Sequence, residues 1–298
     1  MGTESPTSQA KGERVQEQLQ ASLLVLAWMV EARDPYTGGH LWRVSRYSAL
    51  LCEAIGLPAV ETARIAIGGF LHDLGKVAVP DAILRKPGKL NDEEYAVIKT
   101  HPTVGARVLA GHPLAEFVAD AVLLHHEMPD GRGYPNGFEG EDIPLSARIV
   151  GICDAFDAMT SSRPYRAGMQ VAQALAIVES QLGRQFDRAL GRQFLELGAQ
   201  GVLNHVAGHS DDWIPLQSCL VCGPTLAIAR EQRAGDTLFC PSCGSGYRLE
   251  DRHPFALPQV VPTGSRATAN DLAPRADTAL IERFVRDTAQ ALVTEGNR

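Results

Sequence analysis

Long apolar runs are missing from this sequence. The longest run near the N-terminus, Leu23–Val30, has eight residues, whereas a membrane-spanning helix needs roughly 20. The preceding segment, Lys11–Gln20, carries Glu13 and Glu17 among its basic residues, which is unlike the basic start of a signal peptide. We therefore expect a cytoplasmic protein with no membrane contact.

A surplus of positive charge is also absent. The chain of 298 residues has 28 Lys and Arg against 35 Asp and Glu, a net charge of −7. This balance argues against a general binder of nucleic acid or membrane surfaces. It leaves room for an anionic substrate, because a small basic pocket can lie in an acidic protein.

Strand-like alternation is scarce before residue 200. The apolar residues Val15, Leu19, Leu23, Leu26 and Val30 recur every three to four positions, which predicts one helix. Similar patterns predict further helices over 40–55, 58–72, 91 to beyond 101, 113–126, 144–159, 170–182 and 189–197. Helix boundaries are indicated by Gly56, by Pro58 and by a capping box formed by Asn91 and Glu94. The first 200 residues are therefore predicted to be a helical bundle.

Cysteine is sparse, with six residues in the chain, too few for a secreted disulfide scaffold of this length. Cys52 and Cys153 stand alone in apolar patterns and are expected to be buried thiols. The other four form two CxxC pairs with seventeen residues between them, Cys219/Cys222 and Cys240/Cys243. Four thiolates at this spacing predict one structural zinc, as in a zinc ribbon.

Composition divides the chain into five parts. They are a disordered tail over 1–14, the helical domain over 15–200, a zinc-ribbon-like β module over 211–252, a Pro- and Thr-rich linker over 253–275 and a C-terminal helix over 276–298. The fold class is thus mainly α, with a small β module. Whether the ribbon or the C-terminal helix binds a protein partner or a second copy of the chain stays open.

Seven histidines and aspartates lie at predicted helix ends or on apolar helices. They are His40, His72, Asp73, His101, His125, His126 and Asp154. A lone histidine there is usually a satisfied core residue, but so many together would be costly to bury separately. A shared centre of divalent metal satisfies all of them, and imidazole with carboxylate suits iron, manganese or zinc. Lys76, three residues after Asp73, projects from the same face and can stabilise negative charge.

The ordered motifs resemble those of the HD-GYP family, a branch of the HD superfamily of metal-dependent phosphohydrolases. The matching segments lie between residues 25 and 200. They are Arg33–His40, His72–Lys76, Leu84–Leu90, His101–Gly105, His125–Glu127, Asp130–Pro135, Asp154–Thr160, Arg163–Arg166 and Phe186–Asp187.

This resemblance implies an HD-type bundle that hydrolyses cyclic di-GMP to pGpG and onward to GMP. It implies two divalent metals held by the seven residues above, a bridging hydroxide as nucleophile, and Lys76 as the group that stabilises this nucleophile or the transition-state charge. It also implies that Arg163 and Arg166 contact the phosphate or guanine, and that Tyr134 lines the pocket. A surface salt-bridge role for the two arginines is the simpler alternative.

Two other functions stay open. One is an HD-type phosphohydrolase acting on another cyclic dinucleotide or on a nucleotide. The other is a non-catalytic signalling adaptor that binds through the ribbon, although an adaptor has no use for Lys76 and a complete metal set.

The number of metals is predicted from Tyr36. Some members of the family carry a glutamate four residues before the first metal histidine, where it helps to hold a third metal. Here that position is Tyr36, and a phenol with a pKa of about 10 is a poor ligand at neutral pH. Glu31 would need a different backbone path to replace it. We therefore expect two iron or manganese ions, and slow conversion of pGpG to GMP.

Overall fold

The computed structural model describes residues 6–33, 39–86, 88–161, 168–211, 214–228, 232–241, 243–250, 259–272 and 278–293. Helices dominate it, as the sequence predicted. The α-helices are α1 (Pro6–Glu31), α2 (His40–Ala54), α3 (Ala59–Leu71), α4 (Asp81–Leu84), α5 (Asp92–Ile98), α6 (His101–Leu109), α7 (Ala115–Leu124), α8 (Leu145–Thr160), α9 (Val171–Ser180), α10 (Arg188–Ala199) and α11 (Thr278–Val293). Short 3-10 helices are η1 (Leu74–Ala78), η2 (Gly140–Asp142) and η3 (Val202–His205). In the described part of the chain, no helix has both the length and the apolar character that crossing a membrane requires.

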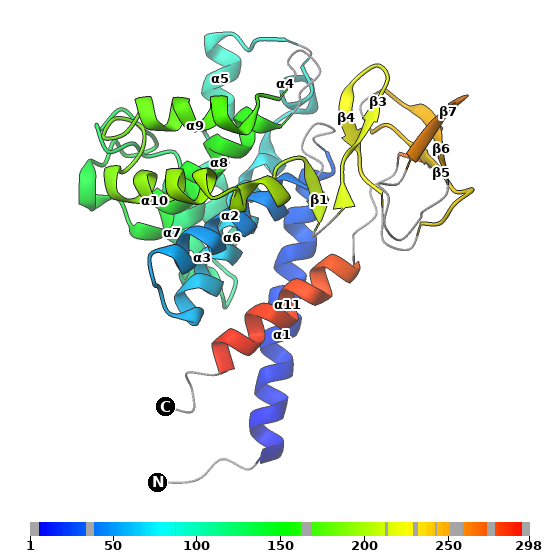
Figure 1. Cartoon of the computed structure of the whole chain (residues 1–298). Helices are drawn as coiled ribbons and strands as arrows, with labels where there is room; N and C mark the ends of the chain where they lie inside the picture. The colour runs from blue at the N-terminus through cyan, green and yellow to red at the C-terminus, as the bar shows by residue number, and fades with distance from the viewer. Residues whose placement is uncertain are drawn as a thin grey trace.

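Helix α2 forms the centre of the helical body (Figure 1), with α3, α8 and α10 packed around it. Its Tyr47 lies edge-on to Phe156 of α8 and Phe194 of α10, with ring centroids 5.2 and 6.2 Å away. Such contacts add to the burial of apolar area. Because α2 is covered on several sides, its polar side chains must find partners inside the protein.

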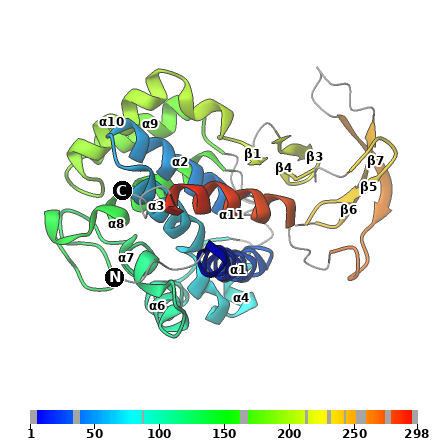
Figure 2. The same cartoon turned by 90° about the horizontal axis from the view of Figure 1, so that it is seen from below.

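The C-terminal helix returns to this body. Figures 1 and 2 show α11 lying across α1, and α11 also contacts α3. Leu280, Ile281 and Val285 are buried there. The rings of Phe284 and Phe70 lie 5.4 Å apart, so α11 is part of the same hydrophobic core as the bundle.

The described strands all lie between α10 and α11 in sequence, and the first of them contacts α2. They are β1 (His209–Asp211), β2 (Ile214–Pro215), β3 (Gln217–Cys219), β4 (Gly223–Leu226), β5 (Thr237–Phe239), β6 (Ser245–Glu250) and β7 (Gln259–Arg266). All pairs are antiparallel, in the orders β1-β2, β3-β4 and β5-β6-β7. A second hydrophobic cluster joins the two last sheets through residues such as Leu226, Leu238 and Leu249.

Three boundary predictions were wrong. Residues 6–14, predicted as part of a disordered tail, are the first turns of α1. The helix predicted from 91 through 101 ends at Ile98, and α6 begins separately at His101. Residues 259–266, predicted as linker, form β7 and pair with β6, because Val260 packs on the small hydrophobic cluster beside its cross-strand partner Leu249.

Candidate metal centre

The predicted metal residues lie mostly where helices begin or end. His40 and His101 are the first residues of α2 and α6, whereas His72 and His125 cap the C-termini of α3 and α7. A helix end fixes a side chain more firmly than a loop does, which is what a binding constellation requires. The remaining members follow directly, as Asp73 and His126, or project from the middle of α8, as Asp154.

Asp73 lies between two groups of histidines. Its Oδ2 is 3.5 Å from Nε2 of both His40 and His72, and its Oδ1 is 3.3 Å from Nε2 of His101. Asp154 Oδ1 completes the first group, 3.5 Å from His40 Nε2 and 3.7 Å from His72 Nε2.

His101, His125 and His126 form the second group. Their ligand atoms lie within 4.8 Å of one another, as do those of His40, His72 and Asp73. The Nε2 atoms of His101 and His125 are 3.2 Å apart. With metal–nitrogen bonds of 2.0–2.1 Å, neighbouring ligands of one ion lie about 3 Å apart. The spacing therefore fits ligands around a divalent metal.

Backbone carbonyls fix the tautomers of three histidines. Nδ1 of His72 donates to Gly69 O at 2.7 Å, Nδ1 of His101 to Ile98 O at 2.8 Å, and Nδ1 of His125 to Ala121 O at 3.0 Å. Each Nε2 is thus left as an acceptor facing the centre, as in metal-ligating histidines. His72 Nε2 is buried without a hydrogen-bond partner among the described residues, and a metal ion would satisfy it.

A carboxylate, Asp157, orients His40. Asp157 is 1% exposed, and its Oδ2 accepts from His40 Nδ1 at 2.8 Å. Arg43 Nε donates to Asp157 Oδ1 at 2.6 Å. Sequence reasoning assigned no role to Asp157 or Arg43. The spacing Asp154–Asp157, three residues on one helical face, was the available signal.

The electrostatics favour metal-binding protonation states at most positions. Burial opposes ionisation of Asp73 and Asp154, but charged neighbours hold both carboxyl pKa values well below their usual range. For Asp73 these neighbours are Lys76 and histidines, and for Asp154 they are histidines, above all His72. Burial lowers the pKa of His101, His125 and His126, the last to about 3.

His40 is the exception. Burial lowers its pKa, but Asp157 and Asp73 outweigh burial and raise the pKa to about 10. In the metal-free chain its ring is therefore protonated at neutral pH, and binding a metal through Nε2 requires the loss of that proton.

Lys76 lies at the edge of the cluster, as predicted. Its Nζ donates to Asp73 Oδ2 at 2.6 Å. A cation in contact with the shared carboxylate is placed to stabilise negative charge that develops beside it.

A cavity of about 360 Å³ opens beside the second histidine group, within the range of small-molecule sites. His126, Tyr134 and Asp154 line it, and the Tyr134 ring stacks on His126 with centroids 4.7 Å apart. Tyr134 therefore lines a cavity beside the histidines, and its contact with substrate stays a prediction. The predicted substrate contacts Arg163 and Arg166 lie outside the described residues.

Glu127 organises the loop that carries Tyr134. Its buried carboxylate accepts from the backbone N–H groups of Asn136, Gly137 and Phe138 at 2.6–3.2 Å. Hydrogen bonds from three consecutive backbone N–H groups to one carboxylate fix this loop beside the histidine cluster. Sequence reasoning placed Glu127 in a motif without this role.

Glu31 has a structural role near the cluster. Its Oε1 accepts from Leu41 N at 3.1 Å, so the carboxylate of α1 caps the first turn of α2. Tyr36, the basis of the two-metal prediction, lies outside the described residues.

The four cysteines of the two CxxC motifs also lie close together. Ligand atoms of Cys219, Cys222, Cys240 and Cys243 all lie within 4.8 Å of one another, as a tetrahedral thiolate site requires. Gly223 and Gly244, one residue after each pair, have φ values of 78° and 70°, and glycine adopts this left-handed conformation without strain.

The chain is similar in sequence to known proteins. A family model described as HD domain matches residues 24–190. Cyclic di-GMP phosphodiesterase response regulator RpfG of Xanthomonas campestris is 43% identical over 180 residues, 60% of this chain and 48% of that protein. A cyclic di-GMP phosphodiesterase of Thermotoga maritima is 38% identical over 177 residues, 59% of this chain and 48% of its own length.

A third relative acts on a different substrate. It is the 3'3'-cGAMP-specific phosphodiesterase 2 of Vibrio cholerae, 38% identical over 197 residues, 65% of this chain and 35% of that protein. The chain thus spans half or less of the length of these curated relatives. Since the family model covers more than half of the chain, the protein belongs to the HD domain family.

Proposed function

We propose that this chain is a metal-dependent phosphodiesterase that hydrolyses cyclic di-GMP to pGpG. One observation carries the proposal: the two oxygens of Asp73 face two separate histidine groups at 3.3–3.5 Å. A shared carboxylate between two sets of ligands is the arrangement that holds a pair of metals. His40, His72 and Asp154 would serve one ion, and His101, His125 and His126 the other.

The donor set favours iron or manganese, because imidazole and carboxylate ligands are mixed. When bound, a pair of such ions supplies a hydroxide nucleophile at neutral pH and neutralises the charge of the phosphodiester. The chain's own groups do the rest. Asp157 holds the His40 ring, Glu127 fixes the Gly-Tyr-Pro loop, and Tyr134 closes one wall of the cavity.

Lys76 would stabilise charge at the reacting phosphate, since its ammonium contacts Asp73 at 2.6 Å. Arg163 and Arg166 remain proposed contacts for phosphate or guanine. Further hydrolysis of pGpG to GMP belongs to the same proposal and is expected to be slow with two metals.

The test is anaerobic incubation of purified chain with cyclic di-GMP, with products separated by chromatography. We expect pGpG to accumulate. Asp73→Ala should abolish turnover and lower metal content, because the shared ligand is lost, while the helical circular dichroism signal stays. Near wild-type turnover by Asp73→Ala would show that the proposed site is wrong.

The relative named for 3'3'-cGAMP supports a second candidate, hydrolysis of that mixed dinucleotide. The same chromatography run with 3'3'-cGAMP separates the two, because the substrate with the higher kcat/KM is the preferred one. If the chain is instead a non-catalytic adaptor, neither dinucleotide gives a product in the presence of iron or manganese.

For the cysteine module we propose one structural zinc per chain, held by the four cysteines. The support is the convergence of their sulfurs together with a hydrophobic cluster too small to stabilise a fold alone. The module, α11 or both would serve as the surface for a protein partner or a second copy of the chain.

A further inference from the structure

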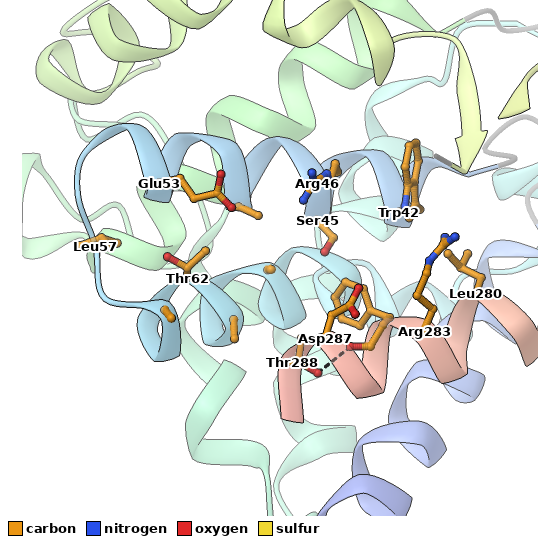
Figure 3. A pocket seen from close by; sticks show the side chains of 15 residues that line it. Trp42, Ser45, Arg46, Glu53, Leu57, Thr62, Leu280, Arg283, Asp287 and Thr288 are labelled. Atoms are coloured by element: carbon orange, nitrogen blue, oxygen red, sulfur yellow. Dashed lines mark hydrogen bonds between the residues drawn. The ribbon is translucent and has the colours of Figure 1, made fainter. Parts of the chain in front are cut away.

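A cavity of about 390 Å³ lies between α2, α3 and α11, and none of the metal-centre residues lines it (Figure 3). Its size is that of a small-molecule site. The wall is largely apolar, with two aromatic side chains, Trp42 of α2 and Phe284 of α11. Small residues, Ala49, Ala63 and Ala66, leave the space open between the helices.

Three buried polar atoms along this wall have no hydrogen-bond partner in the described chain. They are Ser45 Oγ, Arg46 Nε and Thr62 Oγ1. Ser45 is only 2% exposed, and its side chain points from α2 toward α11 (Figure 3). By contrast, Thr288 Oγ1 on the opposite wall donates to Phe284 O at 2.8 Å.

These three atoms can all donate hydrogen bonds, and Arg46 Nε can do nothing else. Leaving buried donors unpaired costs free energy, so their convergence on one cavity points to a ligand that offers acceptors. Arg46 forms no ion pair with any acidic residue in the described part of the chain. The carboxylates that line the cavity, Glu53 and Asp287, are exposed, whereas the Nε atom of Arg46 is buried.

We propose that this cavity binds a small aromatic anion. Its ring would lie against Trp42 and Phe284, and its acidic group would accept from Ser45, Arg46 and Thr62. The site is separate from the metal centre, so its failure would leave the proposed phosphodiesterase untouched.

The test uses the full chain and three matched pairs of probes in isothermal titration calorimetry. The pairs are benzoate with benzamide, indole-3-acetate with indole-3-acetamide, and 1-naphthylacetate with 1-naphthylacetamide. We expect at least one acid to bind once per chain, with its amide at least about tenfold weaker, since a charge-assisted hydrogen bond is lost. Binding of no acid, or equal binding of acid and amide, would overturn the proposal.

Variants locate the binding. Arg46→Met should remove the preference for the acid, and Ala63→Phe should fill the cavity and weaken both members of a pair. Arg64→Met is the matched control, because Arg64 pairs with Glu61 at 2.8 Å and does not line the cavity. If thermal melting shows that Ala63→Phe does not fold, the binding of acid and amide to Arg46→Met still tests the site. Acid binding unchanged in Arg46→Met would place the probe elsewhere and refute the site.

Discussion

Asp157 is the residue that orients His40. Its carboxylate is buried between the His40 ring and the Arg43 guanidinium, with contacts of 2.8 and 2.6 Å. Burial disfavours its charged form, but Arg43 and His40 lower its pKa to about 2. It is therefore ionised at neutral pH and keeps the proton of His40 on Nδ1, so that Nε2 is directed at the metal centre.

From this contact we predict that Asp157→Asn lowers metal affinity or turnover by about 10- to 100-fold, the usual effect of losing a partner behind a metal ligand. The amide keeps the size of the side chain but removes its charge. Metal content after dialysis and turnover at saturating metal separate the two effects. The matched control is Asp120→Asn, at an exposed position of α7, and it should behave as wild type. Wild-type affinity and turnover in Asp157→Asn would refute the orienting role.

The candidate metal residues were predictable from sequence, and the residues that orient them were not. His40, His72, Asp73, His101, His125, His126 and Asp154 were found because each would be costly to bury alone, and the structure brings them together. Arg43 contacts Asp157 across 114 positions of sequence, and no local pattern encodes such a pair. Glu127 was equally hidden, since its role depends on the path of a loop that follows it.

At the scale of elements, close packing of η1 on α6 positions the two histidine groups. A Cβ added to Gly75 of η1 would lie 1.8 Å from His101 O and 2.5 Å from Gly105 N. Only glycine allows this approach. The backbone contact thus fixes the distance between Asp73 and His101.

We therefore predict that Gly75→Ala destabilises the metal-free chain by about 1–3 kcal/mol, as overpacking usually does, and also weakens metal binding. Urea unfolding and metal titration measure the two effects. Gly111→Ala is the control, because an added Cβ there meets nothing within 4 Å. A Gly75→Ala chain as stable as the control would show that η1 and α6 can separate without cost.

The cysteine module gives a second prediction at this scale. Cys240→Ser should release one zinc per chain and unfold the β3–β6 region, because the small cluster around Leu238 and Leu249 cannot hold it alone. The helical circular dichroism signal should remain. Native mass spectrometry measures the zinc. Disulfides between the pairs, with no zinc in the wild type, would contradict the structural site.

The boundaries of helices and strands were the features predicted least accurately from the sequence. The Asn91/Glu94 capping box was correct, because a cap is encoded in adjacent residues. The strand β7 was missed because its Pro262 and Gly264 are typical of loops, and its strand character comes from pairing with β6. The pairing of this segment with β6, and not its local sequence, therefore determines its extended conformation.

In the whole molecule, both terminal helices contact the bundle. Helices α1 and α11 contact each other, and α11 buries Leu280, Ile281 and Val285 against it (Figure 2). The sequence predicted the C-terminal helix but left its docking open, since an amphipathic pattern does not identify the surface that it covers. This docking forms one wall of the cavity lined by Trp42 and Ser45.

The metal centre is the central claim, and counting its ions tests it most directly. Crystals grown from anaerobically purified, iron- or manganese-loaded protein would be measured at the metal absorption edges for anomalous scattering. We predict two ions in this centre, one at His40, His72 and Asp154, the other at His101, His125 and His126, with Asp73 contacting both, in addition to the zinc at the four cysteines. A third fully occupied ion among the histidines and aspartates, or no ion at either histidine group, would contradict the proposed centre.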